Sequence, residues 1–362
     1  MKIGLLLPSI LISERYKDRI FAPGELFSNL AQGLINHKHE VTIYKGNKIL
    51  QNDDFPSVKE NLQSAKIKSQ ITFIRNQNEY EVEMVSRAVD HANKNNLDLL
   101  HVYLSSMTHY FVKYSRAPVL FTLHDPVFPQ NTLEYFRLKL FSNQNYVAIS
   151  QSQNNLYKKL LGINCIATVH HGLDLKNFDF LSIPENYLSM IGRFLPEKGF
   201  DLGIKVAQKL RIPLKIVSSQ NYQKTDYYLK EIKPYLDSPN ISEIDFLYPA
   251  QRNLFLQKSK LFLFPIKWEE PFGMVLIESM ACGTPVVAFA RGSVPEIVKD
   301  GKTGFVVDPN LGFDGLCQAV QKIYSMPDQE YKQMRKACRE HVEKNFTIER
   351  MVDEYEKVYK LL

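Results

Sequence analysis

The stretch WEEPFGMVLIESMACGTPVVAFARGSVPEIVKDGKTGFVVD at Trp268–Asp308 carries the strongest fold signals in the chain. A Pro-Phe-Gly turn precedes a short apolar helix that ends at Gly283, and a buried strand follows at Pro285–Ala290. A helix that runs directly into a buried strand is typical of a parallel α/β sheet. The Asp-Gly-Lys-Thr-Gly sequence at Asp300–Gly304 predicts a hairpin-like turn.

The same stretch combines a helix N-terminus with two acids, Glu270 and Glu278. Gly273 leaves the backbone bare, so the free N–H groups of the first turn can bind an anion such as a phosphate. Carboxylates accept hydrogen bonds from hydroxyl groups, which sugars and riboses offer. The pattern therefore predicts a sugar-nucleotide site. The alternative is an ordinary βαβ crossover whose acids merely cap and solvate a helix, and two acids alone would favour it.

The residues around the two acids point to a known family. With Pro-Phe-Gly at 271–273 and Ala-Cys-Gly-Thr-Pro-Val-Val at 281–287, the stretch resembles the donor-site signature of retaining glycosyltransferases of family 4. The resemblance implies the α/β GT-B fold, in which two Rossmann-like domains face each other across a cleft. We accordingly expect an acceptor-binding domain at 1–175, a donor nucleotide-sugar-binding domain at 176–345, and a C-terminal helix at 346–362 that crosses back to the first domain.

The bulk composition agrees with a globular enzyme of two domains. The chain has 362 residues, 44% of them hydrophobic and 23% charged, and its net charge is +6. That charge is too small for a nucleic-acid-binding footprint, but it is compatible with anionic substrates or with weak peripheral contact at an anionic membrane surface. The four cysteines form no C-x-x-C motif, so neither a zinc site nor a disulfide framework is indicated.

The apolar run at the N-terminus is expected to be a buried strand, because no small-residue cleavage site follows it. No run is long enough for a transmembrane helix. We expect a cytoplasmic protein that can lie at the inner face of the membrane, and its oligomeric state stays open.

Strand and helix patterns alternate through the first half of the chain, and a long loop at Ser9–Gly24 separates the first strand from the first helix. The predicted helices are Glu25–Asn36 and Glu79–Asn95. The predicted strands are Lys2–Pro8, Glu40–Tyr44, Ile71–Ile74, Leu97–Val102, Val119–Leu123 and Tyr146–Ser150.

Two residues of the first half are candidate site residues. Gly24 ends the long loop, where family members commonly carry Gly-Gly close to the donor diphosphate, and an N-cap turn is the alternative. His124 follows the strand Val119–Leu123 at a carboxyl end, where ligands bind in open α/β sheets. The family resemblance implies that this His faces the transferred sugar. His101 and His109 are expected to be packing or surface residues.

The second half shows the same alternation. The predicted strands are Leu188–Ile191, Leu214–Val217, Ile244–Leu247 and Leu261–Pro265. The predicted helices are Phe200–Leu210, Asp226–Lys233, Asn253–Ser259, Phe313–Met326, Gln329–Asn345 and Thr347–Leu362.

A loop at 192–199 carries Arg193 and Lys198 between a strand and a helix. Cations are disfavoured at a helix start, so their presence favours a phosphate-binding role. Arg clamps phosphate oxygens with two parallel bonds, and Lys supplies a point charge. The loop resembles the diphosphate-binding loop of the family.

Roles for the remaining site residues follow from the resemblance. It implies that Glu278 binds the ribose, that Glu270 holds the transferred sugar and stabilises charge near its anomeric carbon, and that the anomeric configuration is retained. N–H groups around Phe272, Gly273 and Met274 would contact phosphate and sugar. The chain has no Asp-x-Asp, and Arg193 and Lys198 supply positive charge, so no metal and no cofactor are expected.

We therefore predict a glycosyltransferase that uses a UDP- or GDP-linked sugar donor. The acceptor, a glycan, a lipid or a small metabolite, is not identified by the sequence. The alternatives are a sugar-nucleotide epimerase, a phosphorylase or a non-catalytic sugar-nucleotide binder on the same fold. A dinucleotide oxidoreductase would need Gly-x-Gly-x-x-Gly after the first strand, and the chain lacks it there.

Overall fold

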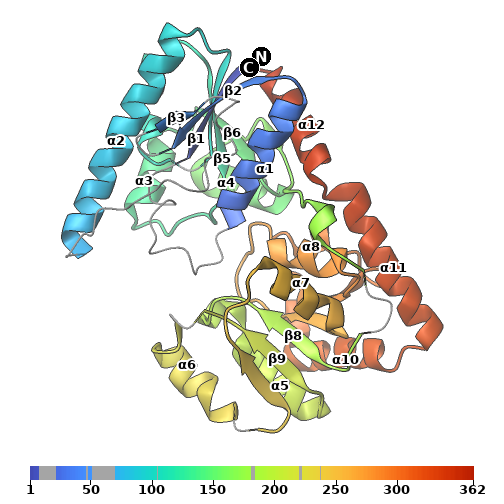
Figure 1. The fold of residues 1–362 in the computed structure, drawn as a ribbon. Coiled ribbons are helices and arrows are strands. Elements are labelled where there is room, and N and C mark those ends of the chain that lie inside the picture. Colours follow the sequence, from blue (N-terminus) through green and yellow to red (C-terminus); the bar gives the residue numbers. More distant parts are fainter. Residues whose placement is uncertain are drawn as a thin grey trace. The chain divides into compact units, whose positions relative to one another are not determined.

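The structure is a computed structural model that describes residues 1–7, 22–45, 48–50, 70–103, 105–180, 184–219, 222–236 and 238–362. The expected loop at Ser9–Gly24 therefore lies outside the described residues, apart from its last three. The chain divides into two compact units, which are described separately (Figure 1). The first unit comprises Met1–His170 and Ile348–Leu362, and the second comprises His171–Thr347.

The described part of the first unit contains a sheet with the strand order β3-β2-β1-β4-β5-β6-β7. Its pairs are parallel except β2 with β3, which is antiparallel. Every residue of β1 after Lys2, and every residue of β4 and β5, is buried, as expected for strands that are covered on both faces. The strands are β1 (Lys2–Leu7), β2 (Glu40–Lys45), β3 (Lys48–Leu50), β4 (Leu99–Val102), β5 (Val119–Leu123), β6 (Asn145–Ala148) and β7 (Ala167–Thr168).

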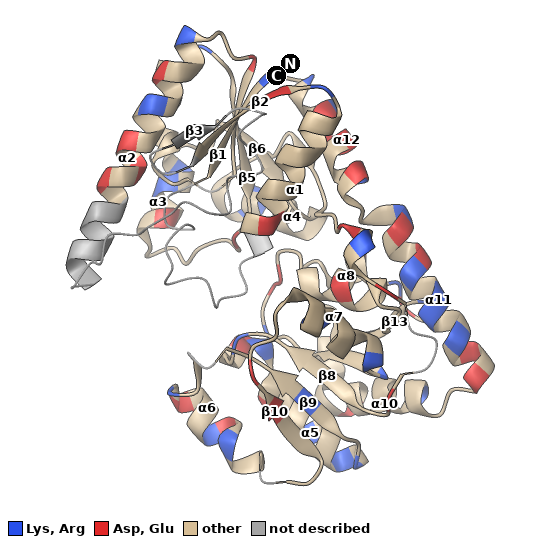
Figure 2. Cartoon of the chain, viewed as in Figure 1, with Lys and Arg blue, Asp and Glu red and all other residues tan. Residues whose placement is uncertain are grey.

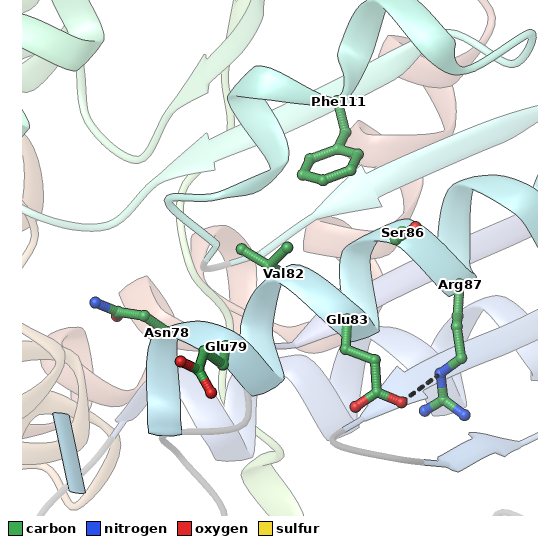
Figure 3. Close-up of a pocket in the computed structure, with 7 residues that line it drawn as sticks. All are labelled: Asn78, Glu79, Val82, Glu83, Ser86, Arg87 and Phe111. Carbon is green, nitrogen blue, oxygen red and sulfur yellow. Dashed lines mark ion pairs between the residues drawn. The ribbon is translucent and has the colours of Figure 1, made fainter. Parts of the chain in front are cut away.

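The helices of the first unit flank this sheet. They are α1 (Ala22–Asn36), α2 (Gln70–Lys94), α3 (Leu133–Leu140), α4 (Gln151–Leu161) and α12 (Ile348–Tyr359). Charged residues of both signs follow one another along the exposed side of α2 (Figure 2). A pocket beside α2 contains none of the predicted site residues (Figure 3). It is lined by Asn78, Glu79, Val82, Glu83, Ser86, Arg87 and Phe111.

The C-terminal helix α12 packs on the first unit. Gly33 of α1 allows this approach, because a Cβ atom there would clash with Val352 of α12. Buried His101 receives or donates hydrogen bonds at both ring nitrogens, 2.8 Å from the hydroxyl of Tyr359 and 2.8 Å from that of Thr122. Burial lowers the pKa of His101 to about 3, so the ring is neutral and belongs to the packing between β4, β5 and α12.

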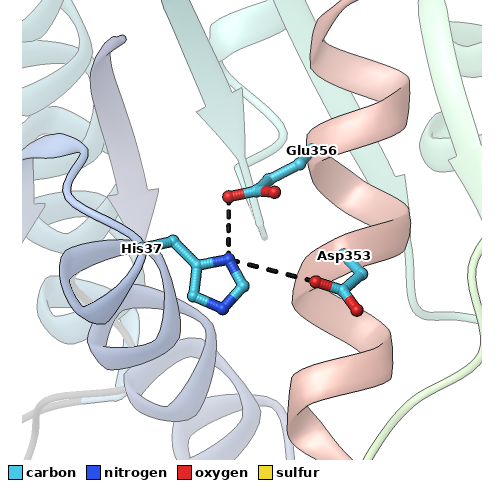
Figure 4. Close-up of side chains that lie close together, drawn as sticks. All are labelled: His37, Asp353 and Glu356. Carbon is cyan, nitrogen blue, oxygen red and sulfur yellow. Dashed lines mark hydrogen bonds and ion pairs between the residues drawn. The ribbon is translucent and has the colours of Figure 1, made fainter.

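Polar contacts also connect α12 to the segment that follows α1. His37 Nδ1 lies 2.9 Å from Glu356 Oε1, and Asp353 lies 4.0 Å from the same ring nitrogen (Figure 4). His39 Nε2 lies 2.7 Å from Glu356 Oε1, so two imidazoles converge on one carboxylate oxygen. Lys38, between them, has φ 67°, in the left-handed region of backbone conformations.

The described part of the second unit contains a fully parallel sheet with the order β10-β9-β8-β11-β12-β13. Renumbered in chain order this is 3-2-1-4-5-6, the doubly wound order of dinucleotide-binding folds. Its strands are β8 (Leu188–Ile191), β9 (Leu214–Val217), β10 (Ile241–Ile244), β11 (Leu261–Phe264), β12 (Val286–Phe289) and β13 (Gly304–Val307). Its helices are α5 (Phe200–Leu210), α6 (Asp226–Glu231), α7 (Pro249–Lys258), α8 (Met274–Ala281), α9 (Val294–Ile297), α10 (Gly312–Tyr324) and α11 (Asp328–Asn345).

Several sequence predictions were wrong in detail. Ile71–Ile74 belongs to helix α2, because a short apolar run does not separate a strand from a helical segment. The strand predicted at Ile244–Leu247 lies three residues earlier, at Ile241–Ile244. The turn at Asp300–Gly304 leads into β13, which pairs with β12 in parallel, so it makes no hairpin. Helix α1 begins at Ala22, not Glu25, because Pro23 is tolerated in a first helical turn.

Among the described residues, no helix is both long and apolar enough to cross a membrane.

Candidate functional site

The predicted site residues of the second unit lie on the loops at one end of its sheet or in the helix α8 that follows one of these loops. In a doubly wound sheet, ligands bind outside the carboxyl ends of the strands where the strand order reverses. Here the reversal falls between β8 and β11. Arg193 and Lys198 follow β8, and Trp268 and Glu270 follow β11, so both loops emerge at this point.

The loop after β8 is anchored by buried packing at both of its ends. Phe194 is fully buried, and its ring meets Phe200 edge-on at 4.9 Å. Gly199 has φ 72°, and a Cβ atom there would clash with the carbonyl oxygen of Pro265. Only glycine combines this conformation with so close an approach. The loop therefore holds its backbone in place while Arg193 stays exposed to solvent.

The centre of the site is an ion pair between Lys198 and Glu270. Lys198 Nζ lies 2.8 Å from Glu270 Oε2, and the two side chains are only 13% and 12% exposed. The indole N–H of Trp268 donates to the same oxygen at 2.9 Å. Lys198 Nζ also lies 4.3 Å from the centre of the Trp268 ring, within range of a cation–π contact. Trp268 thus contacts both members of the pair.

The loop after β12 holds the Glu269–Phe272 turn. Ser293 donates its N–H to the Glu270 carbonyl at 2.9 Å and its hydroxyl to the Phe272 carbonyl at 2.7 Å. The N–H of Gly292 donates to Glu269 Oε2 at 2.6 Å. Gly292 has φ 55°, and a Cβ atom there would clash with the backbone of Glu270. These contacts fix the backbone that carries Glu270.

Helix α8 starts immediately after this turn. Gly273 is its N-cap with φ 81°, and no side chain caps the first N–H groups. Met274 is the first helical residue and is half-buried. The side chain of Phe272 is buried and its ring packs edge-on against that of His171, with the ring centres 4.9 Å apart.

Glu278 lies inside α8 and is paired with Arg252 of α7. Arg252 Nη2 lies 3.1 Å from Glu278 Oε1, and both side chains are 10% exposed. A buried guanidinium beside a carboxylate favours the ionised form of the acid, which can only accept hydrogen bonds. Arg252 was missed in the sequence. Its signal was a charged residue at helical spacing from Phe255 and Leu256, on a buried face.

Trp268 was also missed as a site residue. It was quoted as the first residue of the motif, and nothing in the sequence indicated that its N–H would meet the side chain two positions later.

The two remaining predicted residues belong to the first unit. His124 follows β5, and its ring lies 4.3 Å from that of Tyr103. Burial, with a smaller electrostatic contribution from nearby His101, lowers the pKa of His124 to about 3, so the imidazole is neutral at physiological pH. Gly24 lies in the first turn of α1, where its carbonyl accepts from the Ser28 hydroxyl at 3.2 Å. The sequence predicted that Gly24 ends the loop, but the structure places it in the helix.

The structure thus brings Lys198 and Glu270 into direct contact and places Glu278 in the second turn of α8. Arg193 shares the loop of Lys198. His124 and Gly24 belong to the first unit.

Models of known protein families match both halves of the chain. A family model described as Glycosyl transferases group 1 matches residues 176–341, and one described as Glycosyltransferase Family 4 matches residues 25–177. N-acetyl-alpha-D-glucosaminyl L-malate synthase from Bacillus anthracis is 25% identical over 323 residues, covering 77% of this chain and 79% of that protein. Several other curated relatives match over less than half of their own length.

Solved structures show the same fold. Sucrose-phosphate synthase from Thermosynechococcus elongatus has a TM-score of 0.77 at 17% identity, with 100% of this chain and 98% of that one covered. HepE from Anabaena, in complex with UDP and glucose, has a TM-score of 0.74 at 16% identity with both chains fully covered. The predicted α/β GT-B fold is thereby confirmed. The chain belongs to the group 1 glycosyltransferases, with a family 4 domain in its first half, and is a glycosyltransferase of the GT-B fold.

Proposed function

We propose that this glycosyltransferase transfers a sugar from a nucleoside-diphosphate sugar, UDP-linked in the first instance, with retention of the anomeric configuration. The observation that carries the proposal is the Lys198–Glu270 pair at the strand-order reversal of a doubly wound sheet. It puts a cation for a diphosphate beside a carboxylate for sugar hydroxyls. That HepE, which shares the fold, is solved with UDP and with UDP-glucose supports UDP over GDP.

Arg193 and Lys198 act on the diphosphate, which is the leaving group. Positive charge aimed at the oxygens where negative charge accumulates lowers the barrier to departure. Arg193 is exposed and can reach a ligand directly. Lys198 is held by Glu270 at 2.8 Å, so it must exchange that carboxylate for a phosphate oxygen when the donor binds.

The two acids act on the two ends of the donor. Glu278, ionised beside Arg252, accepts hydrogen bonds from the ribose hydroxyls. Glu270, once released by Lys198, accepts from hydroxyls of the transferred sugar and stabilises positive charge near its anomeric carbon. The backbone N–H groups from Phe272 through Gly273 to Met274 add contacts to phosphate and sugar at an uncapped helix start.

On the first unit, His124 acts as a neutral hydrogen-bond donor or acceptor toward the transferred sugar. A pKa of about 3 means that it carries no charge at neutral pH. Gly24, in the first turn of α1, is the proposed close-approach residue of that unit. The site needs no metal and no cofactor in this proposal, because Arg193 and Lys198 neutralise the diphosphate. The acceptor, a glycan, a lipid or a small metabolite, is reached in the cytoplasm or at the inner face of the membrane.

The donor proposal can be tested by fluorescence, because Trp268 is the single tryptophan of the chain and touches both Lys198 and Glu270. Titration with UDP, GDP, ADP and dTDP should change its emission, with UDP binding most tightly. Arg193→Ala and Lys198→Ala should each weaken UDP binding about tenfold or more, the worth of a charge-assisted hydrogen bond. Lys209→Ala, on the exposed side of α5, serves as the control.

If none of the four nucleotides binds, or if both variants bind UDP as the parent does, the diphosphate assignment is wrong. Retention is tested separately by NMR of the product's anomeric proton, where an inverted product contradicts it. Release of an epimerised nucleotide sugar in place of transfer would identify the epimerase alternative.

A further inference from the structure

Helix α3 exposes a row of large apolar side chains. Leu133 is 80% exposed, Phe136 is 59% exposed and Leu140 is 70% exposed. Their spacing of three and four residues places them along one side of the helix. Tyr135 and Leu138, on the opposite side, are buried in the core of the first unit. The exposed row, called here the α3 face, therefore points straight away from the core.

Further apolar and amphipathic side chains are exposed on the segments that contact α3. The ring of Tyr110, 48% exposed, meets that of Phe141 at the end of α3 edge-on at 5.1 Å. The buried Tyr135 ties α3 to the end of α4 by donating its hydroxyl to the carbonyl of Leu160 at 3.1 Å. Leu160 itself is 42% exposed. Apolar surface that extends over two helices in this way marks a contact site.

Basic residues lie on α3 and α4, the two helices that carry these exposed apolar side chains. Residues 133–161 carry Arg137, Lys139, Lys158 and Lys159 against one acid, Glu134, so four positive charges less one negative leave +3. Figure 2 shows Lys and Arg on α3. The three lysines are exposed, and within the described part of the chain none of these four cations has an ion-pair partner.

We propose that the α3 face docks on the surface of an anionic lipid bilayer. A surface helix with large apolar side chains and flanking lysines is the form that binds at the headgroup boundary, with its apolar side chains inserted and its cations on the lipid headgroups. A tyrosine beside it suits the same boundary, because its ring is apolar and its hydroxyl is polar. The charge complementarity favours a bilayer over a second copy of the chain, whose identical face would present the same positive charges.

The test is co-sedimentation of the full chain with phosphatidylcholine vesicles that contain about one third phosphatidylglycerol. The parent chain should bind these vesicles, and binding should weaken in high salt or in vesicles of phosphatidylcholine alone. A triple variant of the α3 face should bind at least tenfold more weakly, since burial of one large apolar side chain is already worth about that factor. Its substitutions are Leu133→Ser, Phe136→Ser and Leu140→Ser.

The matched control replaces three leucines of comparable exposure elsewhere and should bind vesicles as the parent does. They are Leu229, Leu311 and Leu361, which are 45%, 59% and 71% exposed. A charge variant, in which Lys139, Lys158 and Lys159 become Gln, should lose the preference for anionic vesicles.

The docking proposal is overturned if the parent does not bind anionic vesicles or if the triple variant binds them equally well. It is also overturned if the triple variant changes only the sedimentation velocity from dimer to monomer, which would make the α3 face a self-association surface. UDP titration of every variant, followed at Trp268, keeps the proposed transferase function separate. That function fails on its own if UDP binds to none of them.

Discussion

The Lys198–Glu270 pair leads to a prediction that runs against ordinary expectation for a site residue. Glu270→Gln should tighten the binding of free UDP while it abolishes sugar transfer. In the unliganded chain, the Lys198 ammonium donates to Glu270 Oε2 at 2.8 Å, and UDP has to compete with that carboxylate for the cation. A glutamine oxygen is a weaker competitor because it carries no charge.

The size of the effect follows from the contact. Lys198 keeps its charge when Glu270 becomes Gln, so the substitution removes the attraction between two charges and leaves a weaker hydrogen bond to a neutral amide oxygen, worth about half of the 1.5–3 kcal/mol that a bond between ionised partners contributes. Both side chains are nearly buried, so solvent screens the contact little. The substitution therefore lowers the free-energy cost of freeing Lys198 by about 1–1.5 kcal/mol, which corresponds to a roughly tenfold lower dissociation constant for UDP.

Isothermal titration calorimetry is the suitable assay, because Trp268 donates to Glu270 and its emission would change with the substitution itself. Glu269→Gln is the matched control. It removes the same charge one residue away, but Glu269 is bound to Gly292 and Arg291 and has no part in the Lys198 pair. If Glu270→Gln leaves the affinity for UDP unchanged or weaker, or if Glu269→Gln tightens it equally, the competition argument is refuted.

Three further predictions concern stability. Arg252→Met should lower the free energy of unfolding by about 3–5 kcal/mol, since it leaves Glu278 buried without its cation, and adding Glu278→Gln should restore much of that loss in a denaturant titration. Burial alone would raise the pKa of Glu356, but hydrogen bonds from His39 and His37 hold that pKa below its usual range. The stability it contributes is therefore present above the unfolded carboxyl pKa and lost as pH falls through the folded one, so Glu356→Gln should lower Tm at pH 7, and this difference should shrink as pH falls below about 4. Gly199→Ala should destabilise the fold more than Gly162→Ala in thermal melts, because both have positive φ but only at Gly199 would the added Cβ atom meet other atoms.

The sequence predicted the central strands closely. The bounds of β5, β8 and β9, and those of α5, match the predicted ranges, because a strand buried on both faces reads as an uninterrupted apolar run. The errors fall where that signal is weak. The sequence Ile-Thr-Phe-Ile at 71–74 is too short a run to decide between strand and helix, and here the segment belongs to the helix that continues through the following residues.

The sequence predicted which residues belong to the candidate site, but it did not predict which of them contact one another. Lys198 and Glu270 were both named, but the sequence separates them by 72 positions, and no local rule brings them together. Their contact depends on the parallel pairing of β8 with β11, which delivers both loops to one edge of the sheet. Arg252 was missed for a similar reason, since its partner lies on another helix, 26 positions away.

The two ion pairs of the site differ in a way that assigns them different tasks. Lys198 is a compact point charge on a flexible stem, so it can leave Glu270 for a phosphate oxygen without rebuilding the loop that carries it. Arg252 is a planar guanidinium held between α7 and α8, and both it and Glu278 are buried. Freeing Glu278 from Arg252 would separate two opposite charges in the interior, which is costly. In the proposed mechanism we therefore expect donor binding to exchange the first pair and preserve the second, which would keep one carboxylate fixed for the ribose while the other becomes available at the reacting sugar.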